Sequence, residues 1–320
     1  SLRMLFDACA TDTACSTAYP DLRQVFFNTV QYLNSNPVNT IITDPFTGER
    51  YDALLTGDVF IGLVFQLLYQ TEALPVLPQL ITDVSNSDFE TLIRIRGTIL
   101  AQSSVVSRGM SFSVQCNEEL SFSSLTDFEA VLVDYPELAS FFKGSTLGYA
   151  AYEVCSFWGA GKAADIENLP VTSNIPTLVM SGEFDPITPP AWSHQAAETL
   201  ENSFFYLYPN VGHGASTVSG CPQDMMLAFL DDHPAPPDDT CIAEISLKFS
   251  IPTTTEHTVE FRSFTDEENR VNGLVPVGWS EVASGAYTRG ESALDSTALL
   301  MQSSSGQIED WLEDFTNRSG

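Results

Sequence analysis

The chain has 320 residues, 43% of them hydrophobic and 11% aromatic, a composition typical of a globular protein and not of a disordered one. Its 42 acidic residues against 13 basic ones give a formal net charge of −29, and such a surface repels nucleic acids and anionic lipids. The longest apolar stretch, Val59 to Tyr69, reaches only about half the length of a membrane-spanning helix. We therefore expect no nucleic-acid partner and no membrane span.

Residues 1–110 are predicted to be helical. Between Asp21 and Asn34, apolar residues recur at helical spacing and mark one face of a helix: Leu22, Val25, Phe26, Val30 and Leu33. Thr56 or Asp58 can cap the apolar helix that follows. Two prolines interrupt the next segment, and residues 88–102 resume a helical pattern.

Residues 111–242 are predicted to mix strands and helices. Phe112 to Cys116 alternates like a short strand, and residues 124–142 are again mostly helical. Farther along, two apolar runs of strand length end at Gly182 and Pro209, with a helical segment between them. A stretch rich in proline and aspartate, residues 231–239, then marks a boundary.

Residues 243–320 are predicted to form a β-containing extension. The segments ISLKFSI (245–251) and HTVEFRSF (257–264) alternate with period two, as half-buried strands do. From Gly273 onward the chain is rich in serine, glycine and acidic residues, and a short helix is predicted from Ile308 to Phe315. No pattern in this part indicates a function.

The six cysteines lie in three local pairs: Cys9 with Cys15, Cys116 with Cys155, and Cys221 with Cys241. Six cysteines can be joined in many ways, so the sequence alone does not fix the pairing. Their even number, without C-x-x-C spacing or histidines at ligand spacing, favours disulfides over a metal site. Disulfides indicate an oxidising compartment, so we expect a secreted, periplasmic or cell-surface protein.

Each of the two apolar runs places a polar group just beyond its end, Asp185 after the first and His213 after the second. In α/β-hydrolases, the acid and base of a Ser-His-Asp triad occupy such loops, in the chain order nucleophile, acid, base. Histidine is a good base near neutral pH, and a buried carboxylate fixes its tautomer. That order requires an upstream serine on a G-x-S-x-G turn, and none of the 320 residues forms one.

Several motifs resemble the C-terminal region of the TAP-like α/β-hydrolases, exported serine peptidases related to tripeptidyl aminopeptidases and proline iminopeptidases: GEFDPITPP, PNVGHG and GCP…AFLDDHPAPPDDTC. The start, CATDTACSTAYPDLRQVFFNTVQYLNSNPV, resembles the segment that follows the family's nucleophile-bearing half, where its helical lid begins. SVQCNEE and CSFW resemble its lid-to-core cysteine motifs. The resemblance covers about residues 1–242.

The resemblance implies an α/β fold with a helical cap at residues 1–110, part of the hydrolase core at 111–242, and an unplaced extension at 243–320. Carried over by position, Asp185 is the triad acid and His213 the triad base, while the serine and the oxyanion-hole donors have no counterpart. The chain begins at Ser1 without a methionine or a signal peptide, so we expect that a preceding segment was removed or is missing.

The resemblance therefore implies a fragment of an exported serine hydrolase, aminopeptidase-like in its action, whose missing N-terminal half supplies the nucleophile. The substrate would be a peptide or a small ester, no metal or organic cofactor is needed, and the chain alone would be inactive. An esterase of the same fold is one alternative. A non-catalytic secreted binding protein that retains a hydrolase-like cap is another.

Other side chains admit two interpretations. Glu118 and Glu119 could hold the free amine of a peptide, since a carboxylate pairs with an ammonium group in a partly dry site, or they could be solvated acids at a helix start. Asp185 could merely start a turn at the following proline, and His213, between two glycines, could be an ordinary loop residue.

His194 is predicted to lie on a helix surface, and Trp158 and Trp192 to be packing residues rather than substrate platforms. His233, in the acidic linker, and His257, in the distal β segment, carry no predicted role.

Overall fold

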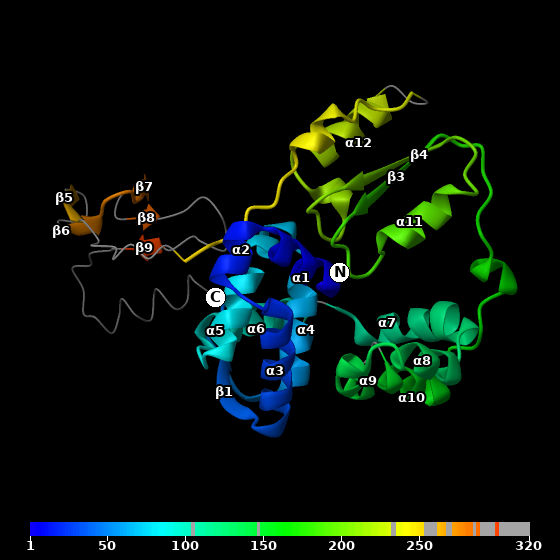
Figure 1. Cartoon of the computed structure of the whole chain (residues 1–320), viewed down its shortest axis with the longest axis horizontal. Helices are drawn as coiled ribbons and strands as arrows, with labels where there is room; N and C mark the ends of the chain where they lie inside the picture. The colour runs from blue at the N-terminus through cyan, green and yellow to red at the C-terminus, as the bar shows by residue number, and fades with distance from the viewer. Residues whose placement is uncertain are drawn as a thin grey trace. The chain divides into compact units, whose positions relative to one another are not determined.

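The chain divides into two units, Ser1–Pro252 and Thr253–Gly320, which are described separately (Figure 1). In this computed structural model the described residues are 1–103, 106–145, 148–231, 235–252, 261–266, 271–283, 286–288 and 298–300. The domain boundaries expected at residues 110 and 242 stay predictions.

The first part of the Ser1–Pro252 unit consists of helices and one β-hairpin. The helices are α1 (Leu2–Thr11), α2 (Thr13–Ala18), α3 (Leu22–Ser35), α4 (Gly57–Leu67), the 3₁₀ helix η1 (Thr71–Val76), α5 (Leu77–Ser85) and α6 (Glu90–Ser103). The hairpin pairs β1 (Val38–Thr43) with β2 (Arg50–Leu55) in antiparallel register. This hairpin was not predicted. The Asp44 carboxylate stabilises its turn by accepting hydrogen bonds from the backbone N–H groups of Phe46 and Thr47.

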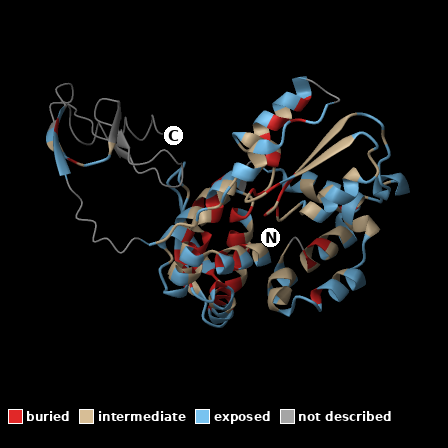
Figure 2. Ribbon diagram, turned by 45° about the horizontal axis from the view of Figure 1, so that its top comes forward, coloured by how far each residue is buried: buried red, intermediate tan, exposed pale blue. Residues whose placement is uncertain are grey.

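The main hydrophobic core lies among these helices, where Figure 2 shows the buried residues concentrated. The face predicted for α3 is confirmed, because Leu22, Phe26, Val30 and Leu33 are buried and Val25 packs partly buried against them. The ring of Phe26 lies 5.1 Å from that of Phe60 on α4, so the two helices meet through an aromatic contact.

A second helical group follows in the chain. It comprises α7 (Arg108–Val114), the π-helical turn η2 (Gln115–Glu119), η3 (Leu120–Phe122), α8 (Leu125–Leu132), η4 (Pro136–Leu138), α9 (Ala139–Gly144) and α10 (Tyr149–Trp158). The strand predicted from Phe112 to Cys116 is wrong, because this stretch is helical. Ser107 caps its start by accepting a hydrogen bond from the N–H of Met110, and Cys116 is tied to α10 by a disulfide.

The α/β part of the unit contains η5 (Asp165–Asn168), β3 (Thr177–Gly182), α11 (Pro190–Ala197), β4 (Ser203–Tyr208), η6 (Ala215–Thr217), α12 (Cys221–Asp231) and η7 (Thr240–Glu244). Strands β3 and β4 are parallel, with Thr177 opposite Ser203, and α11 connects them. The two strands and the helix predicted here are therefore confirmed. A smaller core forms beside them around Tyr208, Val211 and Met225.

Residues 245–252, predicted to contain a strand, pair with no strand in the described part of the chain. They lie extended against the main core, where Leu247, Phe249 and Ile251 pack at alternate positions. Two hydrogen bonds hold this segment in place. The Tyr19 hydroxyl donates to the carbonyl of Ser250, and the N–H of Ser250 donates to the carbonyl of Pro75. Its period-two pattern thus arises from packing on helices.

The second unit contains β5 (Phe261–Asp266) paired with β6 (Val271–Pro276), and a sheet of β7 (Ser280–Ala283), β8 (Ala286–Thr288) and β9 (Ala298–Leu300). All of these pairs are antiparallel. The strand predicted at 257–264 is present from Phe261 onward, whereas His257 and the helix predicted from Ile308 to Phe315 lie outside the described residues.

The three cysteine pairs seen in the sequence form disulfides: Cys9–Cys15, Cys116–Cys155 and Cys221–Cys241. The first is buried in the main core, the second joins η2 to α10, and the third joins the start of α12 to η7. No helix in the described ranges has both the length and the apolar character that a membrane crossing requires.

Candidate functional site

The loop after β3 is held against the loop after β4 by backbone contacts. The N–H of Glu183 donates to Tyr208, and that of Phe184 donates to Val211. A Cβ atom on Gly182 would lie 2.0 Å from the carbonyl oxygen of Gly212, so the two loops approach this closely only because Gly182 has no side chain. This contact brings the Asp185 and His213 loops together.

Asp185 is 3% exposed, and both of its carboxylate oxygens are hydrogen-bonded. Oδ1 accepts from the N–H groups of Ile187 and Thr188, each at 2.8 Å. Oδ2 accepts from the Thr188 hydroxyl at 2.8 Å and lies 2.9 Å from Nδ1 of His213. Asp185 therefore starts a turn and also contacts the histidine, so both interpretations of this residue apply. One carboxylate oxygen accepts from the turn and the other lies against His213.

His213 is anchored by the chain that follows α4. Its backbone N–H donates to the carbonyl of Tyr69 at 3.0 Å, and the preceding Gly212 donates to Oγ1 of Thr71 at 3.0 Å. The Tyr69 ring lies edge-on to the imidazole, with centroids 5.3 Å apart. Burial, together with the charge of Asp185, raises the pKa of Tyr69. Neither Tyr69 nor Thr71 was identified from the sequence, because no local pattern marks them.

The geometry leaves one ring nitrogen of His213 available. With Nδ1 protonated and donating to Asp185, Nε2 carries a lone pair and can accept a proton. The His213 side chain is 38% exposed, and no hydrogen bond to Nε2 forms within the residues that the structure describes. The pair can therefore act as a general base supported by a buried carboxylate.

Within the described residues, no hydroxyl or thiol side chain hydrogen-bonds to Nε2 of His213. Thr188 Oγ1 lies 3.5 Å from Nδ1 of His213, but its hydroxyl donates to Asp185. Ser181, in the VMSGE motif, is 2% exposed, and its hydroxyl has no hydrogen-bond partner in the described part of the chain. Groups of side chains able to hold a metal ion are likewise absent from that part.

The other predicted site residues lie apart from this pair. Glu118 and Glu119 are exposed on η2, and within the described ranges their side chains form no hydrogen bond or ion pair. His194 on α11 lies at the surface, 3.5 Å from Glu198, as expected. His233 and His257 lie outside the described residues.

Trp158 packs as predicted: its ring lies tilted against that of Phe112, with centroids 5.7 Å apart, and its indole N–H donates to the Ser113 hydroxyl. The packing role predicted for Trp192 is wrong, because this side chain is 62% exposed. It stands on the first turn of α11, a helix without buried residues.

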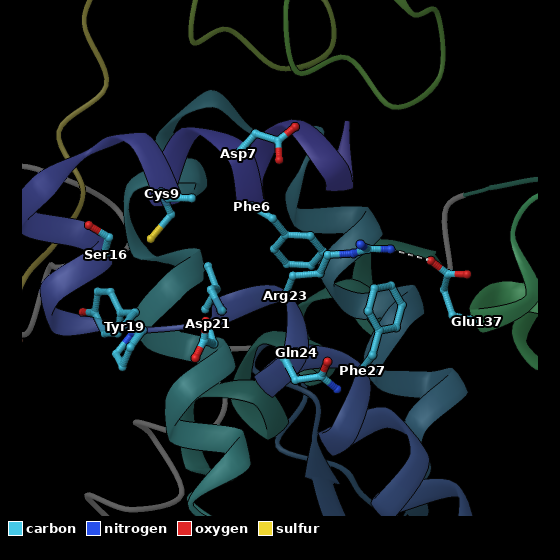
Figure 3. Close-up of a pocket in the computed structure, with 13 residues that line it drawn as sticks. Phe6, Asp7, Cys9, Ser16, Tyr19, Asp21, Arg23, Gln24, Phe27 and Glu137 are labelled. Carbon is cyan, nitrogen blue, oxygen red and sulfur yellow. Dashed lines mark hydrogen bonds and ion pairs between the residues drawn. The ribbon is translucent and has the colours of Figure 1, made fainter.

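A cavity of about 750 Å³ lies between α1, α2 and α3 and is shown in Figure 3. Arg23 lines this cavity and pairs with Glu137 at 3.0 Å, while its guanidinium lies over the Phe27 ring. Asp7 and Asp21 line it as well, but neither Asp185 nor His213 does.

The comparisons with known proteins identify the part of the chain that carries the pair. A family model described as "TAP-like protein", of the α/β-hydrolase type, matches residues 140–241, a range that includes β3, β4, Asp185 and His213. No curated protein and no solved structure matches the chain.

Proposed function

We propose that the chain, whose residues 140–241 match the TAP-like α/β-hydrolase model, belongs to a serine hydrolase acting by acyl transfer. The observation that carries the proposal is the 2.9 Å contact between Nδ1 of His213 and Oδ2 of the buried Asp185. This contact leaves Nε2 open toward an attacking hydroxyl.

The chemistry follows from the two side chains. As a serine hydroxyl attacks the substrate carbonyl, Nε2 of His213 takes its proton, and the Asp185 carboxylate stabilises the imidazolium that forms. The imidazolium then returns the proton to the leaving group, and an acyl-enzyme remains. Water activated by the same nitrogen hydrolyses it. The N–H and O–H donors of its own turn hold the Asp185 carboxylate in position toward His213.

We propose that the serine comes from an N-terminal half of the same protein, which also supplies further strands. Parallel sheets are normally covered on both faces, yet residues Thr177 to Met180 of β3 are only half-buried and Leu207 of β4 is 40% exposed. Additional strands beside β3 and β4 would bury these positions. Residues 1–110 would then form the helical cap.

The substrate class we favour is a peptide cleaved in an aminopeptidase-like manner, with an ester of similar size as the alternative. The resemblance of the sequence motifs to exported peptidases supports this choice. Three disulfides support export, because such bonds persist in oxidising compartments. Nothing in the contacts of Glu118 and Glu119 adds to the case for amine binding.

The test is covalent labelling of the full-length gene product with a fluorophosphonate probe, followed by identification of the labelled residue. We expect a label on a serine that precedes Ser1. We also expect His213→Ala to slow labelling at least about a thousandfold, because the base is lost. His194→Ala is the matched control, since it removes an exposed histidine from α11, and it should label normally.

Two outcomes would contradict the proposal. A stoichiometric label on a serine within residues 1–320 would refute the assignment of the nucleophile to another segment. A full-length protein that folds but never labels would instead favour a secreted binding protein that keeps the hydrolase framework without its catalysis.

A further inference from the structure

A small apolar cavity adjoins the Asp185 loop. It has a volume of about 190 Å³, and its wall comes from Ser1 and Leu2 at the chain start, from α4 and α9, from Leu138 of η4 and from Pro186, the residue after Asp185. Helices α4 and α9 contribute Ile61, Phe65, Phe141 and Phe142, and Leu68 follows α4. Helices α4 and α9 pack directly on each other, so the wall is held by tertiary contacts. None of the lining residues carries a charged side chain, although the chain as a whole has a net charge of −29.

Two ring contacts connect this wall to the proposed base. Phe65 lies edge-on to Tyr69, with ring centroids 5.6 Å apart, and Tyr69 lies edge-on to His213 at 5.3 Å. Pro186, which also lines the cavity, follows Asp185, whose carboxylate contacts the same imidazole. The wall of the cavity is thus connected to the Asp185–His213 pair twice, through Phe65 and Tyr69 and through Pro186.

The size and the apolar lining of the cavity indicate which kind of chemical group fits into it. A cavity of about 150 Å³ lined by leucine, isoleucine and phenylalanine side chains can hold a benzene molecule, so about 190 Å³ accommodates one phenyl-sized group. A charged side chain placed there would lose its hydration without gaining a partner, which is costly. A short side chain would leave much of the cavity empty.

We propose that this cavity is the subsite for one large apolar side chain of the substrate, of phenylalanine or leucine size. This inference rests on the proposed function, because it assigns the cavity to the substrate of the Asp185–His213 pair. In this proposal, the residues around α4 and α9, and not Glu118 and Glu119, determine which substrate side chain is bound.

Binding tests the subsite without requiring hydrolysis. The dissociation constants of N-acetyl-phenylalaninamide, N-acetyl-alaninamide and N-acetyl-aspartamide are measured on the full-length protein by ligand-observed NMR. We expect the alanine and aspartate ligands to bind at least about tenfold more weakly than the phenylalanine ligand. Equal affinities for the three ligands would overturn the proposal.

Variants of the wall locate the binding. Leu138→Lys places a charge in the cavity and should raise the dissociation constant of the phenylalanine ligand at least about tenfold. Val133→Lys, on a side chain that is 77% exposed, is the matched control and should bind normally. Phe142→Ala enlarges the cavity and should improve the binding of N-acetyl-tryptophanamide, a gain that misfolding cannot produce.

The two proposals fail separately. In one case, the full-length protein prefers the phenylalanine ligand, Leu138→Lys abolishes this preference, and no serine is labelled by fluorophosphonate. That result would uphold the subsite as a binding pocket and refute the hydrolase. In the other case, a serine is labelled, but the affinity for the phenylalanine ligand is the same in both wall variants as in the wild type. That result would uphold the hydrolase and refute the subsite.

Discussion

At the scale of single residues, Asp185 performs two structural tasks with one carboxylate. Oδ1 closes the turn through the N–H groups of Ile187 and Thr188, and Oδ2 contacts His213. A buried charge is tolerated only when it is well hydrogen-bonded, and these contacts meet that requirement. The turn holds the carboxylate in place, so the orientation of the histidine does not depend on a mobile side chain.

Gly182 permits the approach of the two loops, so Gly182→Ala should separate them. Its Cβ would overlap the carbonyl of Gly212 at 2.0 Å, and neither backbone can move freely. We expect a loss of about 3 kcal/mol in the free energy of unfolding, measured in urea on the full-length protein. Gly144→Ala is the control, because nothing lies within 4 Å of its Cβ and its φ is ordinary. Equal stability of the two variants would contradict this account.

Tyr208 makes stability sensitive to alkaline pH. Burial, followed by the neighbouring Tyr206, raises its pKa to about 12, whereas an unfolded tyrosine ionises near pH 10. The folded state thus favours the neutral phenol. This contribution is fully present below about pH 10 and is lost as the pH rises through about 12.

Accordingly, wild type should lose stability relative to Tyr208→Phe between about pH 10 and 12, as measured by urea midpoints. Below that range the two proteins should differ little, because the hydrogen bond of the hydroxyl within the described residues is a weak one to the sulfur of Met225, at 3.5 Å. A constant difference across the whole pH range would show that ionisation of Tyr208 is not the cause.

At the scale of elements, α4 links the core to the candidate site. Phe60 and Val64 are buried in the main core, Phe65 lines the apolar cavity, and the chain just beyond the helix holds Gly212 and His213. Of the two predicted caps, Thr56 is the one used, accepting from the N–H of Val59 at 3.2 Å. Asp58 instead contacts Asn34 and Ser140.

Removing this cap should destabilise the helix modestly. We expect Thr56→Ala to lower the free energy of unfolding by about 1 kcal/mol, because the N–H of Val59 loses its acceptor. Thr56→Ser keeps a hydroxyl and should restore most of the loss. If thermal or urea unfolding shows the serine variant to be as unstable as the alanine variant, the hydrogen bond is not the source of the stabilisation.

At the scale of the whole molecule, the helical group from α7 to α10 depends on a covalent link. Its buried side chains in the described ranges are Cys116, Leu132 and Ala151, too few for a core of its own. The Cys116–Cys155 disulfide closes a loop of 39 residues, which corresponds to about 4 kcal/mol in the chain-entropy model. The disulfide therefore replaces part of the stability that packing does not provide.

Replacing Cys116 and Cys155 together by serine should open this group to proteases at low enzyme concentration. The matched control is the double replacement of Cys9 and Cys15, whose loop spans 6 residues and is worth only about 2 kcal/mol in the same model. Cleavage sites mapped by mass spectrometry should cluster between α7 and α10 in the first variant alone. Similar cleavage patterns in both variants would contradict a special dependence on Cys116–Cys155.

Local patterns in the sequence predicted the features that depend on neighbouring residues. The buried face of α3, the Thr56 cap, the β3–α11–β4 order and the loops carrying Asp185 and His213 all follow from periodicity and turn chemistry. Local patterns gave wrong predictions where alternation of apolar residues, taken as a sign of a strand, had another cause. Phe112 to Cys116 alternates yet is helical, and residues 245–251 alternate because they pack on helices rather than in a sheet.

The sequence by itself determined that an acid and a base follow two parallel strands, because strand ends and loop residues are adjacent in the chain. Only the tertiary structure decided what surrounds them. Thr71 meets Gly212 across 141 residues of sequence, and Phe65, Phe141 and Pro186 line one cavity although they come from three separate segments. Such contacts have no local signature, because they form only when the core of α4 has positioned distant segments side by side.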